Sequence, residues 1–326
     1  CSRARSARSV GRLVPAQRRC DGTAGGAALD IQCRNVEVQE LSREEMATAA
    51  IDIGLRPDPD GSFGPIEPLL RIPFHLWLVE RILLSGLRQE MGDLRRASSQ
   101  AALLDIFWAT NVSGATYGES REVLVSHAVT AMLIDRVLSV SLEEAFRPGL
   151  TKALVGLLSD EVFSRPPTTP AVVQFSHNIL FDDAVSRQIP TDSAGLVTFL
   201  AADESRVFFL RPSLVLYYSR IWHRNRAHFW TMYWELLGNQ NIGIRLASRL
   251  IPTWVIAVET RVSNDLLPIV ERAMQGGVGL DDASLLLKAI RTDGSTADER
   301  WLDVLGGIVP RIAPAFPGEL PFGACS

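Results

Sequence analysis

The sequence has few cysteines and no long apolar run. Its four cysteines form no C-x-x-C pair, and two of them, Cys1 and Cys325, lie at the ends of the 326 residues. This pattern argues against a structural zinc site and against a disulfide framework, and it favours a reducing, cytoplasmic location. No stretch approaches the roughly 18 apolar residues that span a bilayer, so we expect no membrane-spanning helix.

Lysine is almost missing as well. Lys152 and Lys288 are the only two, and we attribute the excess of arginine to codon usage. The net charge of −4 gives no global field that would draw the chain to nucleic acid or to an anionic membrane. Hydrophobic residues make up 47% and charged residues 21%, as in folded proteins. The length favours about two or three structural units.

Motifs for phosphate binding and hydrolysis do not occur either. The glycine-rich stretches 22–26 and 276–279 lack the Lys and Ser/Thr of G-x-x-x-x-G-K-[ST], so we expect neither to hold phosphate. H-E-x-x-H and G-x-S-x-G are absent, and the spacing of His223 and His228 does not place both on one helical face. We therefore name no catalytic residue and no metal ligand.

The signals that are present are mostly helical. Ser42–Glu45 forms a capping box that predicts a helix to about Ile53, and Pro73 predicts the start of an apolar helix that ends at Gly86. The four prolines of residues 56–68 indicate a linker or a long loop. Further helices are predicted at 99–110, 119–139, from Ser141 to before Pro148, and at 150–158, 192–202, 212–224, 226–237, 241–258, 264–275, 280–291 and 296–307, the last after a capping box at Thr296–Glu299.

Strand signals are short. Residues 171–175 follow a proline-rich turn and predict a buried strand, and Asn35–Val38 is a second β-prone piece. A helix is predicted directly after the first strand, with His177 in its first turn. Because a helix N-terminus attracts anions, a neutral imidazole there could donate a hydrogen bond to one. The alternative is a structural histidine, packed at the junction and hydrogen-bonded to backbone.

A family resemblance favours the first interpretation. Phe175-Ser176-His177, followed by Asp182-Asp183-Ala184, resembles the F-x-H…E-x-x-A signature in the winged-helix domain of STAND-class signalling NTPases of the NACHT type. Arg71–Leu76 resembles the motif in the helical lid of that family whose proline packs against the nucleotide base. Val36–Glu45 is similar to the last strand of the nucleotide-binding domain running into that lid.

Two weaker similarities extend the resemblance, which covers about residues 36–240. Leu104–Trp108 is similar to bacterial members of the family, and Cys1–Arg3 resembles the tail of the strand that carries the first sensor arginine. Both Walker motifs are missing from these residues. We therefore expect a fragment of a longer protein that does not hydrolyse ATP by itself, whereas the full-length parent would be an ATPase.

The resemblance implies a mainly α fold with four parts. Residues 1–40 would end a nucleotide-binding domain or be disordered. Residues 41–147 would form a helical lid bundle, 148–190 a small winged-helix unit with a short β element, and 191–326 an α-helical repeat-like sensor array. His177 and Pro73 would sense bound ATP or ADP, with Mg²⁺ in the parent. The chain would be the regulatory portion of a cytoplasmic signalling switch, related to defence, that forms a homo-oligomer when active.

Two other classes of function compete with this interpretation. In the switch, the helical array would sense a protein or another ligand. The first competing class is a helical scaffold for protein–protein interaction that binds no nucleotide. A winged helix could also bind DNA. However, residues 178–187 carry Asp182 and Asp183 and a single arginine, which is the wrong charge for reading a groove. We therefore expect no nucleic-acid partner and no membrane partner.

Overall fold

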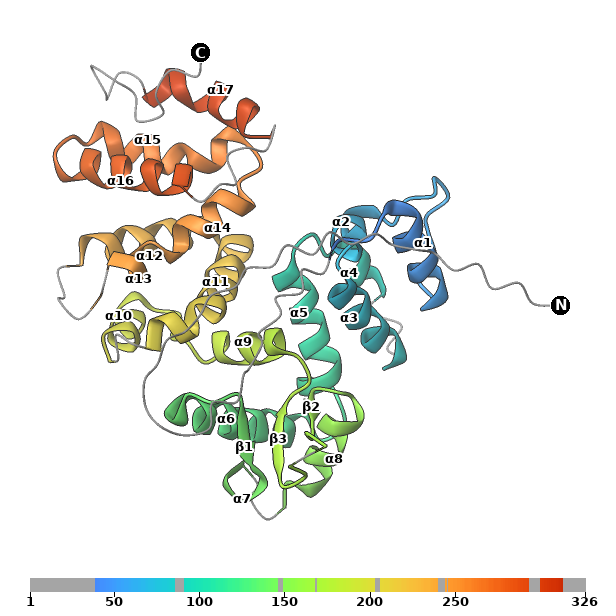
Figure 1. Ribbon diagram of the computed structural model, residues 1–326. Coiled ribbons are helices and arrows are strands. Elements are labelled where there is room, and N and C mark those ends of the chain that lie inside the picture. The colour runs from blue at the N-terminus through green and yellow to red at the C-terminus, as the bar shows by residue number, and fades with distance from the viewer. Residues whose placement is uncertain are drawn as a thin grey trace, which may run out of the picture. The chain divides into compact units, whose positions relative to one another are not determined.

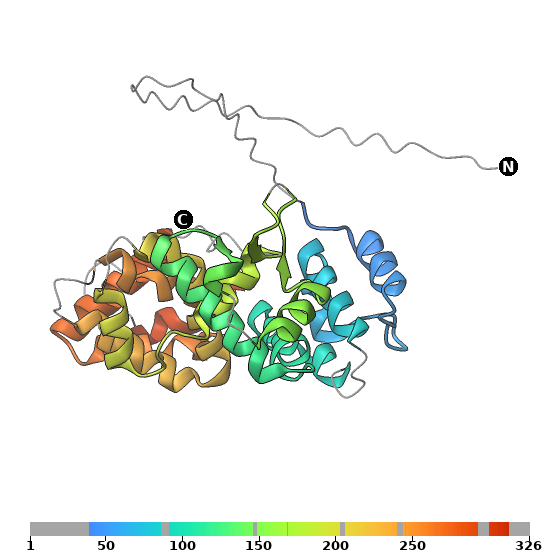
Figure 2. The ribbon, with the colours of Figure 1, turned by 90° about the horizontal axis from the view of Figure 1, so that it is seen from below.

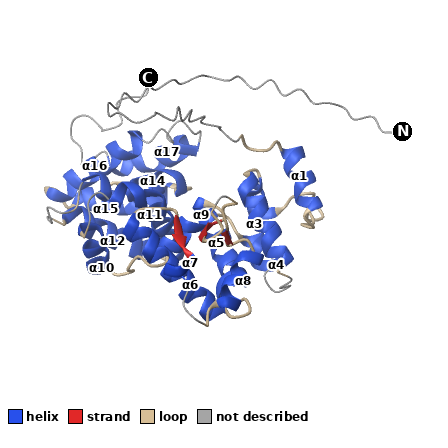
Figure 3. Cartoon of the chain, turned by 60° about the horizontal axis from the view of Figure 1, so that its bottom comes forward, coloured by secondary structure: helices blue, strands red, loops and turns tan. Residues whose placement is uncertain are grey.

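The computed structural model describes residues 39–85, 91–145, 149–167, 169–202, 206–239, 244, 246–292 and 300–312. In these ranges the chain is mainly helical, with one small three-stranded antiparallel sheet, which confirms the predicted fold class (Figures 1 and 3). Figure 2 shows the same helices from below. The cysteines, the β-prone piece Asn35–Val38 and the capping box Thr296–Glu299 lie outside the described ranges.

The first helices begin where local signals predict. In α1 (Arg43–Asp52) the Ser42 hydroxyl accepts from the Glu45 N–H at 3.3 Å, and Glu45 Oε2 accepts from the Ser42 N–H at 2.9 Å. Pro73 is the first residue of α3 (Pro73–Leu84) because it has no N–H to leave unpaired there. Three further helices in this part of the chain are α2 (Glu67–Leu70), α4 (Met91–Arg96) and α5 (Gln100–Trp108), and α5 continues into a π-helical turn, Ala109–Ser113.

The predicted linker or long loop at residues 56–68 is irregular over residues 56–63, but its last residues are helical. A 3₁₀ turn, Gly64–Ile66, leads directly into α2. Phe63, Ile66 and Leu70 are buried in the hydrophobic core beside α3. Pro65 and Pro68 lie in the first turns of these short helices, so the second half of the segment packs as part of the helical bundle.

The sheet is assembled from three separated pieces of chain. Its strands are β1 (Ser139–Ser141), β2 (Phe163–Ser164) and β3 (Val172–Phe175), in the order β1-β3-β2. Val140 pairs with Val173 and Phe163 pairs with Phe175. The associated helices are α6 (Gly118–Asp135), α7 (Leu142–Ala145), α8 (Thr151–Ser159) and α9 (Asn178–Ser186). From α6 to β3 the order is helix, strand, helix, helix, strand, strand, which is the order of a winged helix.

This unit begins earlier than the expected boundary at residue 148. The predicted helix 119–139 ends at Asp135, where Arg136 takes a left-handed conformation with φ 56°, and the chain then enters β1. A three-residue strand has almost no local signature, because its pairing with β3 is made far along the sequence. The sheet therefore draws α6, β1 and α7 into the same unit as α8 and β3.

Helices follow one another in the C-terminal part. They are α10 (Ser193–Ala201), α11 (Arg206–Arg224), α12 (Arg226–Gly238), α13 (Leu246–Arg249), α14 (Ile251–Glu259), α15 (Leu267–Met274), α16 (Val278–Thr292) and α17 (Arg300–Ile312). Successive helices such as α11 and α12, or α15 and α16, pack against each other (Figure 1). Between α11 and α12 lies an aromatic core of Tyr218, Trp222, Phe229 and Tyr233.

Two helix boundaries here differ from those predicted. We took Pro212 as the start of a helix, but α11 begins at Arg206 and continues through this exposed proline. The helix predicted at 241–258 consists of two shorter helices, α13 and α14, and Pro252 lies near the start of the second. Proline is compatible with the first turn of a helix, so a new start at Ile251 is the less strained arrangement.

Candidate functional site

The two residues predicted to sense nucleotide lie at the starts of two helices, α3 and α9, which are linked by a contact between His177 and Phe74. Pro73 is exposed at the N-terminus of α3, after Ile72 in an extended conformation. His177 is exposed at the N-terminus of α9, at the end of β3. It is the N-cap residue rather than part of the first helical turn, with φ −141° and ψ 140°. The fold brings His177 to Phe74, the residue after Pro73, from about a hundred residues away in the sequence.

The ring of His177 contacts the first turns of α3. Its centroid lies 4.2 Å from that of Phe74 and 6.4 Å from that of Trp77. The ring does not cap α9, because the N-cap bonds are made by the backbone: His177 O accepts from Leu180 N at 3.0 Å. Neither ring nitrogen has a hydrogen-bond partner among the described residues, unlike the backbone-bonded structural histidine that was the alternative interpretation. Both nitrogens are therefore available to a ligand.

Partial desolvation affects the protonation state of this histidine although its side chain is exposed. Partial desolvation against the aromatic rings lowers the pKa of His177 below its usual value of 6.5, so the imidazole is neutral at pH 7. A neutral imidazole donates one N–H and accepts at its other nitrogen. The first N–H groups of α9 have no partner within the helix and add a partial positive charge beside it. This arrangement suits an anion better than a cation.

Trp77 is held in place from the other side. Its Nε1 donates to Glu161 Oε2 at 3.2 Å, and Arg81 Nη1 lies 3.2 Å from Glu161 Oε1. Glu161 has a left-handed backbone, with φ 56°, at the end of α8. A hollow of about 550 Å³ adjoins this residue and is lined also by Phe163 and Ser176, but not by His177 or Pro73. The bonds of Glu161 to Trp77 and Arg81 hold in place the aromatic ring that His177 contacts.

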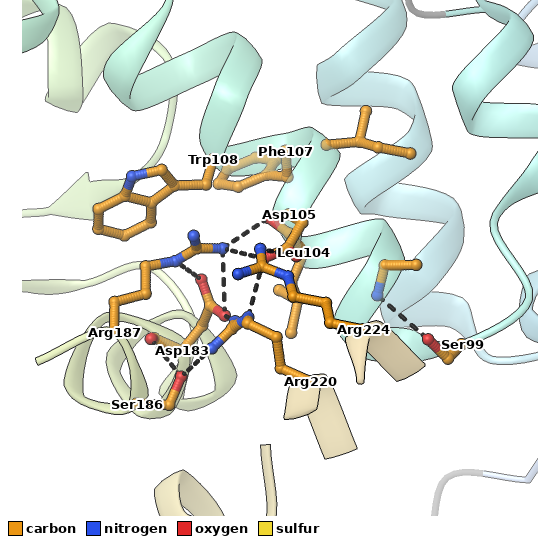
Figure 4. Close-up of polar contacts among 12 residues, drawn as sticks. Ser99, Leu104, Asp105, Phe107, Trp108, Asp183, Ser186, Arg187, Arg220 and Arg224 are labelled. Carbon is orange, nitrogen blue, oxygen red and sulfur yellow. Dashed lines mark hydrogen bonds and ion pairs between the residues drawn. The ribbon is translucent and has the colours of Figure 1, made fainter. Parts of the chain in front are cut away.

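Sequence reasoning missed a second polar centre, in which the arginines Arg187, Arg220 and Arg224 converge on Asp105 and Asp183 (Figure 4). Arg220, from α11, donates to Asp183 on α9, to Asp105 on α5 at 2.9 Å and to the Ser186 hydroxyl at 2.8 Å. Arg187 donates to Asp183 and Asp105, each at 2.8 Å. We call these five charged residues the Arg–Asp cluster. It joins α5, α9 and α11.

The Arg–Asp cluster is largely buried, and its arginines favour the ionised form of Asp105. The Asp183 side chain is 2% exposed and the Arg220 side chain 9% exposed. Desolvation favours the neutral form of Asp105, but the charges of Arg220, Arg187 and Arg224 outweigh it and hold the pKa of this carboxyl below its usual value. The guanidinium of Arg187 also lies over the Trp108 ring, 4.5 Å from its centroid. A sequence signal existed, because Asp105, Asp183 and Arg220 each interrupt an otherwise apolar stretch.

The pKa of the neighbouring Asp182 is shifted upward, opposite to that of Asp105, and this shift predicts a pH dependence of stability. Burial, with a smaller contribution from Asp183, raises its pKa to about 6, although Ser213 donates to it at 2.7 Å. Because the folded-state pKa lies above the unfolded value, stability is lost as the pH rises through about 6. We expect Asp182→Asn to stabilise the fold at pH 7 by about 1–2 kcal/mol, allowing for partial exposure.

The measurement is the urea-unfolding free energy of wild type and variant between pH 4 and pH 8. The advantage of Asp182→Asn should shrink toward pH 4, where the wild-type carboxyl is protonated in the folded state. The matched control is Asp183→Asn, which should destabilise the fold because the Asp183 side chain pairs with Arg187 and Arg220. A variant at position 182 no more stable than wild type at pH 7 would contradict the prediction.

Comparison of the chain with models of protein families, with curated proteins and with solved structures finds no match. None of the helices in the described ranges has the length and apolar character needed to cross a membrane. Within the same ranges, His, Cys, Asp and Glu side chains nowhere gather in threes around a possible metal ion. His223 instead faces Glu259 at 3.1 Å, and His228 lies 3.1 Å from the Thr191 carbonyl oxygen.

Proposed function

We propose that this chain is the regulatory portion of a cytoplasmic, nucleotide-dependent signalling switch of the STAND NTPase, NACHT-type class, with a role in defence. The observation that carries the proposal is the meeting of His177 with the first turn of α3, which begins at Pro73. A nucleotide held against this junction would place its base near Pro73 and its phosphates near His177 and the N-terminus of α9.

In this proposal the residues of the chain bind the nucleotide and couple its binding to the conformation of the protein, but they do not catalyse its hydrolysis. The unpartnered imidazole donates its N–H to a phosphate oxygen and stabilises the compact, ADP-bound state. The winged-helix order from α6 to β3 and the helices after α9 support the proposal. The Walker motifs and the bound Mg²⁺ would belong to the full-length parent. A ligand of the helical array would shift the equilibrium to an open state that assembles into a homo-oligomer.

The test separates the N–H donor of His177 from its ring. His177→Phe keeps an aromatic ring against Phe74 and Trp77 but cannot donate, whereas His177→Asn loses the ring and keeps a donor. We expect His177→Phe to weaken ADP binding by the full-length protein about tenfold or more, since a hydrogen bond to a charged group is lost. His177→Asn should keep part of the affinity. The measurement is isothermal titration calorimetry with ADP.

His223→Ala serves as a control, because that ring faces Glu259 and not the α3–α9 junction. Wild-type affinity in His177→Phe would show that the ring only packs and would overturn the assigned role. A full-length protein that binds neither ADP nor ATP would favour the alternative of a helical scaffold for protein–protein interaction.

A further inference from the structure

A second hollow lies beside the Arg–Asp cluster. It has a volume of about 480 Å³, within the range of about 300–1,000 Å³ that is usual for small-molecule sites. Its wall is built by α5, α6, α9 and α11, by the segment after α9, and by the start of α12. These elements come from widely separated parts of the sequence. The position is therefore one that a ligand could occupy only in the folded protein.

One part of the wall is apolar. Val125, Ile189 and Ile221 line it, together with the rings of Trp108 and Tyr217. Trp108 is fixed on both sides: its Nε1 lies 3.4 Å from Glu122 Oε1, and the Arg187 guanidinium covers its ring. A rigid aromatic side chain among branched aliphatic ones favours a flat, apolar ligand body, because little side-chain freedom is lost on binding.

The other part of the wall is rich in hydrogen-bond donors. Arg187, Arg220 and Arg224 line the hollow, but the aspartates that they bind, Asp105 and Asp183, do not. Arg220 uses all three nitrogens within the Arg–Asp cluster. Arg224 uses only Nη2, toward Asp105, so its Nε and Nη1 have no partner in the described ranges. Nη1 of Arg187 is also without a partner there.

The charges around the hollow determine how highly charged a ligand it can attract. Glu122 is the one carboxylate that lines the hollow among the described residues. Counted with Asp105 and Asp183, the three arginines are balanced by three carboxylates, so no net field draws a highly charged ligand. Attraction comes from the free guanidinium N–H groups at short range, which bind an oxyanion group by charge-assisted hydrogen bonds.

We propose that this hollow binds a small molecule that combines a planar apolar body with a single oxyanion group, either a phosphate or a carboxylate. The oxyanion binds the free N–H groups of Arg224 and Arg187, and the body packs against Trp108 and Ile221. Because the site lies away from His177 and Pro73, the proposal does not rest on nucleotide sensing. A ligand here contacts α5, α6, α9 and α11 at once and so favours their assembled arrangement.

The test is isothermal titration calorimetry of the chain with 1-naphthyl phosphate and with 1-naphthoate, which distinguish the two oxyanions. For ligands of this size we expect a Kd of about 1 mM or tighter for at least one of them. 1-Naphthol, which has the body without the anion, and inorganic phosphate, which has the anion without the body, should both bind at least about tenfold more weakly.

Two variants and one control locate the binding. Arg224→Gln removes the free guanidinium from a side chain that is 65% exposed, so the fold should persist, and binding of the naphthyl anions should weaken about tenfold. Ser126→Trp, from an exposed position on α6 that lines the hollow, should fill the apolar part and abolish binding. Arg211→Gln, also exposed on α11 but outside the hollow, should bind as wild type.

The proposal is overturned by any of three results. The first is that neither naphthyl anion binds the wild-type chain. The second is that the tighter-binding naphthyl anion binds wild type, Arg224→Gln and Ser126→Trp equally. The third is that inorganic phosphate binds as tightly as the naphthyl anions. A thermal unfolding curve of each variant confirms that it is folded. Failure here leaves the ADP experiment on His177 unaffected, because that experiment uses another ligand and another surface.

Discussion

Replacing Arg220 with alanine is expected to lower the free energy of unfolding by about 3–5 kcal/mol. The variant removes the guanidinium that bonds Asp183 and Asp105 and leaves the Asp183 carboxylate, whose side chain is 2% exposed, with one cation fewer. A buried charge that loses a partner keeps its desolvation cost without compensation. Urea unfolding followed by far-UV circular dichroism at pH 7 measures the loss.

Arg224→Ala is the matched control for Arg220→Ala. Arg224 reaches Asp105 at 2.7 Å from the same helix, but its side chain is 65% exposed. Exposed ion pairs contribute about 0–1 kcal/mol, so this variant should stay close to wild type. A loss of similar size in both variants would show that burial does not determine the effect. A double-mutant cycle of Arg220→Ala with Asp183→Ala should give a coupling energy of about 1–3 kcal/mol.

Gly118→Ala is expected to have the second-largest effect, a loss of about 1–3 kcal/mol. A Cβ atom at this position would lie 1.9 Å from the Ser113 carbonyl oxygen and 2.8 Å from its carbonyl carbon. Both atoms belong to the backbone at the end of the π-helical turn Ala109–Ser113, so they cannot move without shifting the connection between α5 and α6. The thermal unfolding midpoint measures the loss.

Gly306→Ala in α17 provides the comparison. Nothing lies within 4 Å of the Cβ that would be added there, and the residue is exposed. Alanine is the better helix former, so this variant should gain up to about 1 kcal/mol. The two substitutions are chemically identical, and a difference of sign between them would trace the effect to the contact with Ser113. A stable Gly118→Ala protein would mean that the α5–α6 connection relaxes easily.

Local chemistry allowed part of the fold to be predicted. The capping box at Ser42, the proline start of α3 and the strand before His177 each depend on residues a few positions apart. Helical periodicity and the scarcity of strand signals then give the mainly α class. The same reasoning failed for β1, because three residues become a strand only through pairing with β3. It also failed for residues 64–68, which form a 3₁₀ turn and the start of α2 around the buried Ile66 instead of a loop.

The candidate sites show the same division. The sequence by itself placed His177 between a strand and a helix and Pro73 at a helix start, because strand, turn and helix signals are local. Only the tertiary structure decided that the His177 ring meets Phe74 and that Arg220 joins Asp105 to Asp183. Such contacts join residues tens to about a hundred positions apart and are selected by packing and by the need to neutralise buried charge. Neither requirement leaves a periodic pattern in the chain, so folding alone determines both sites.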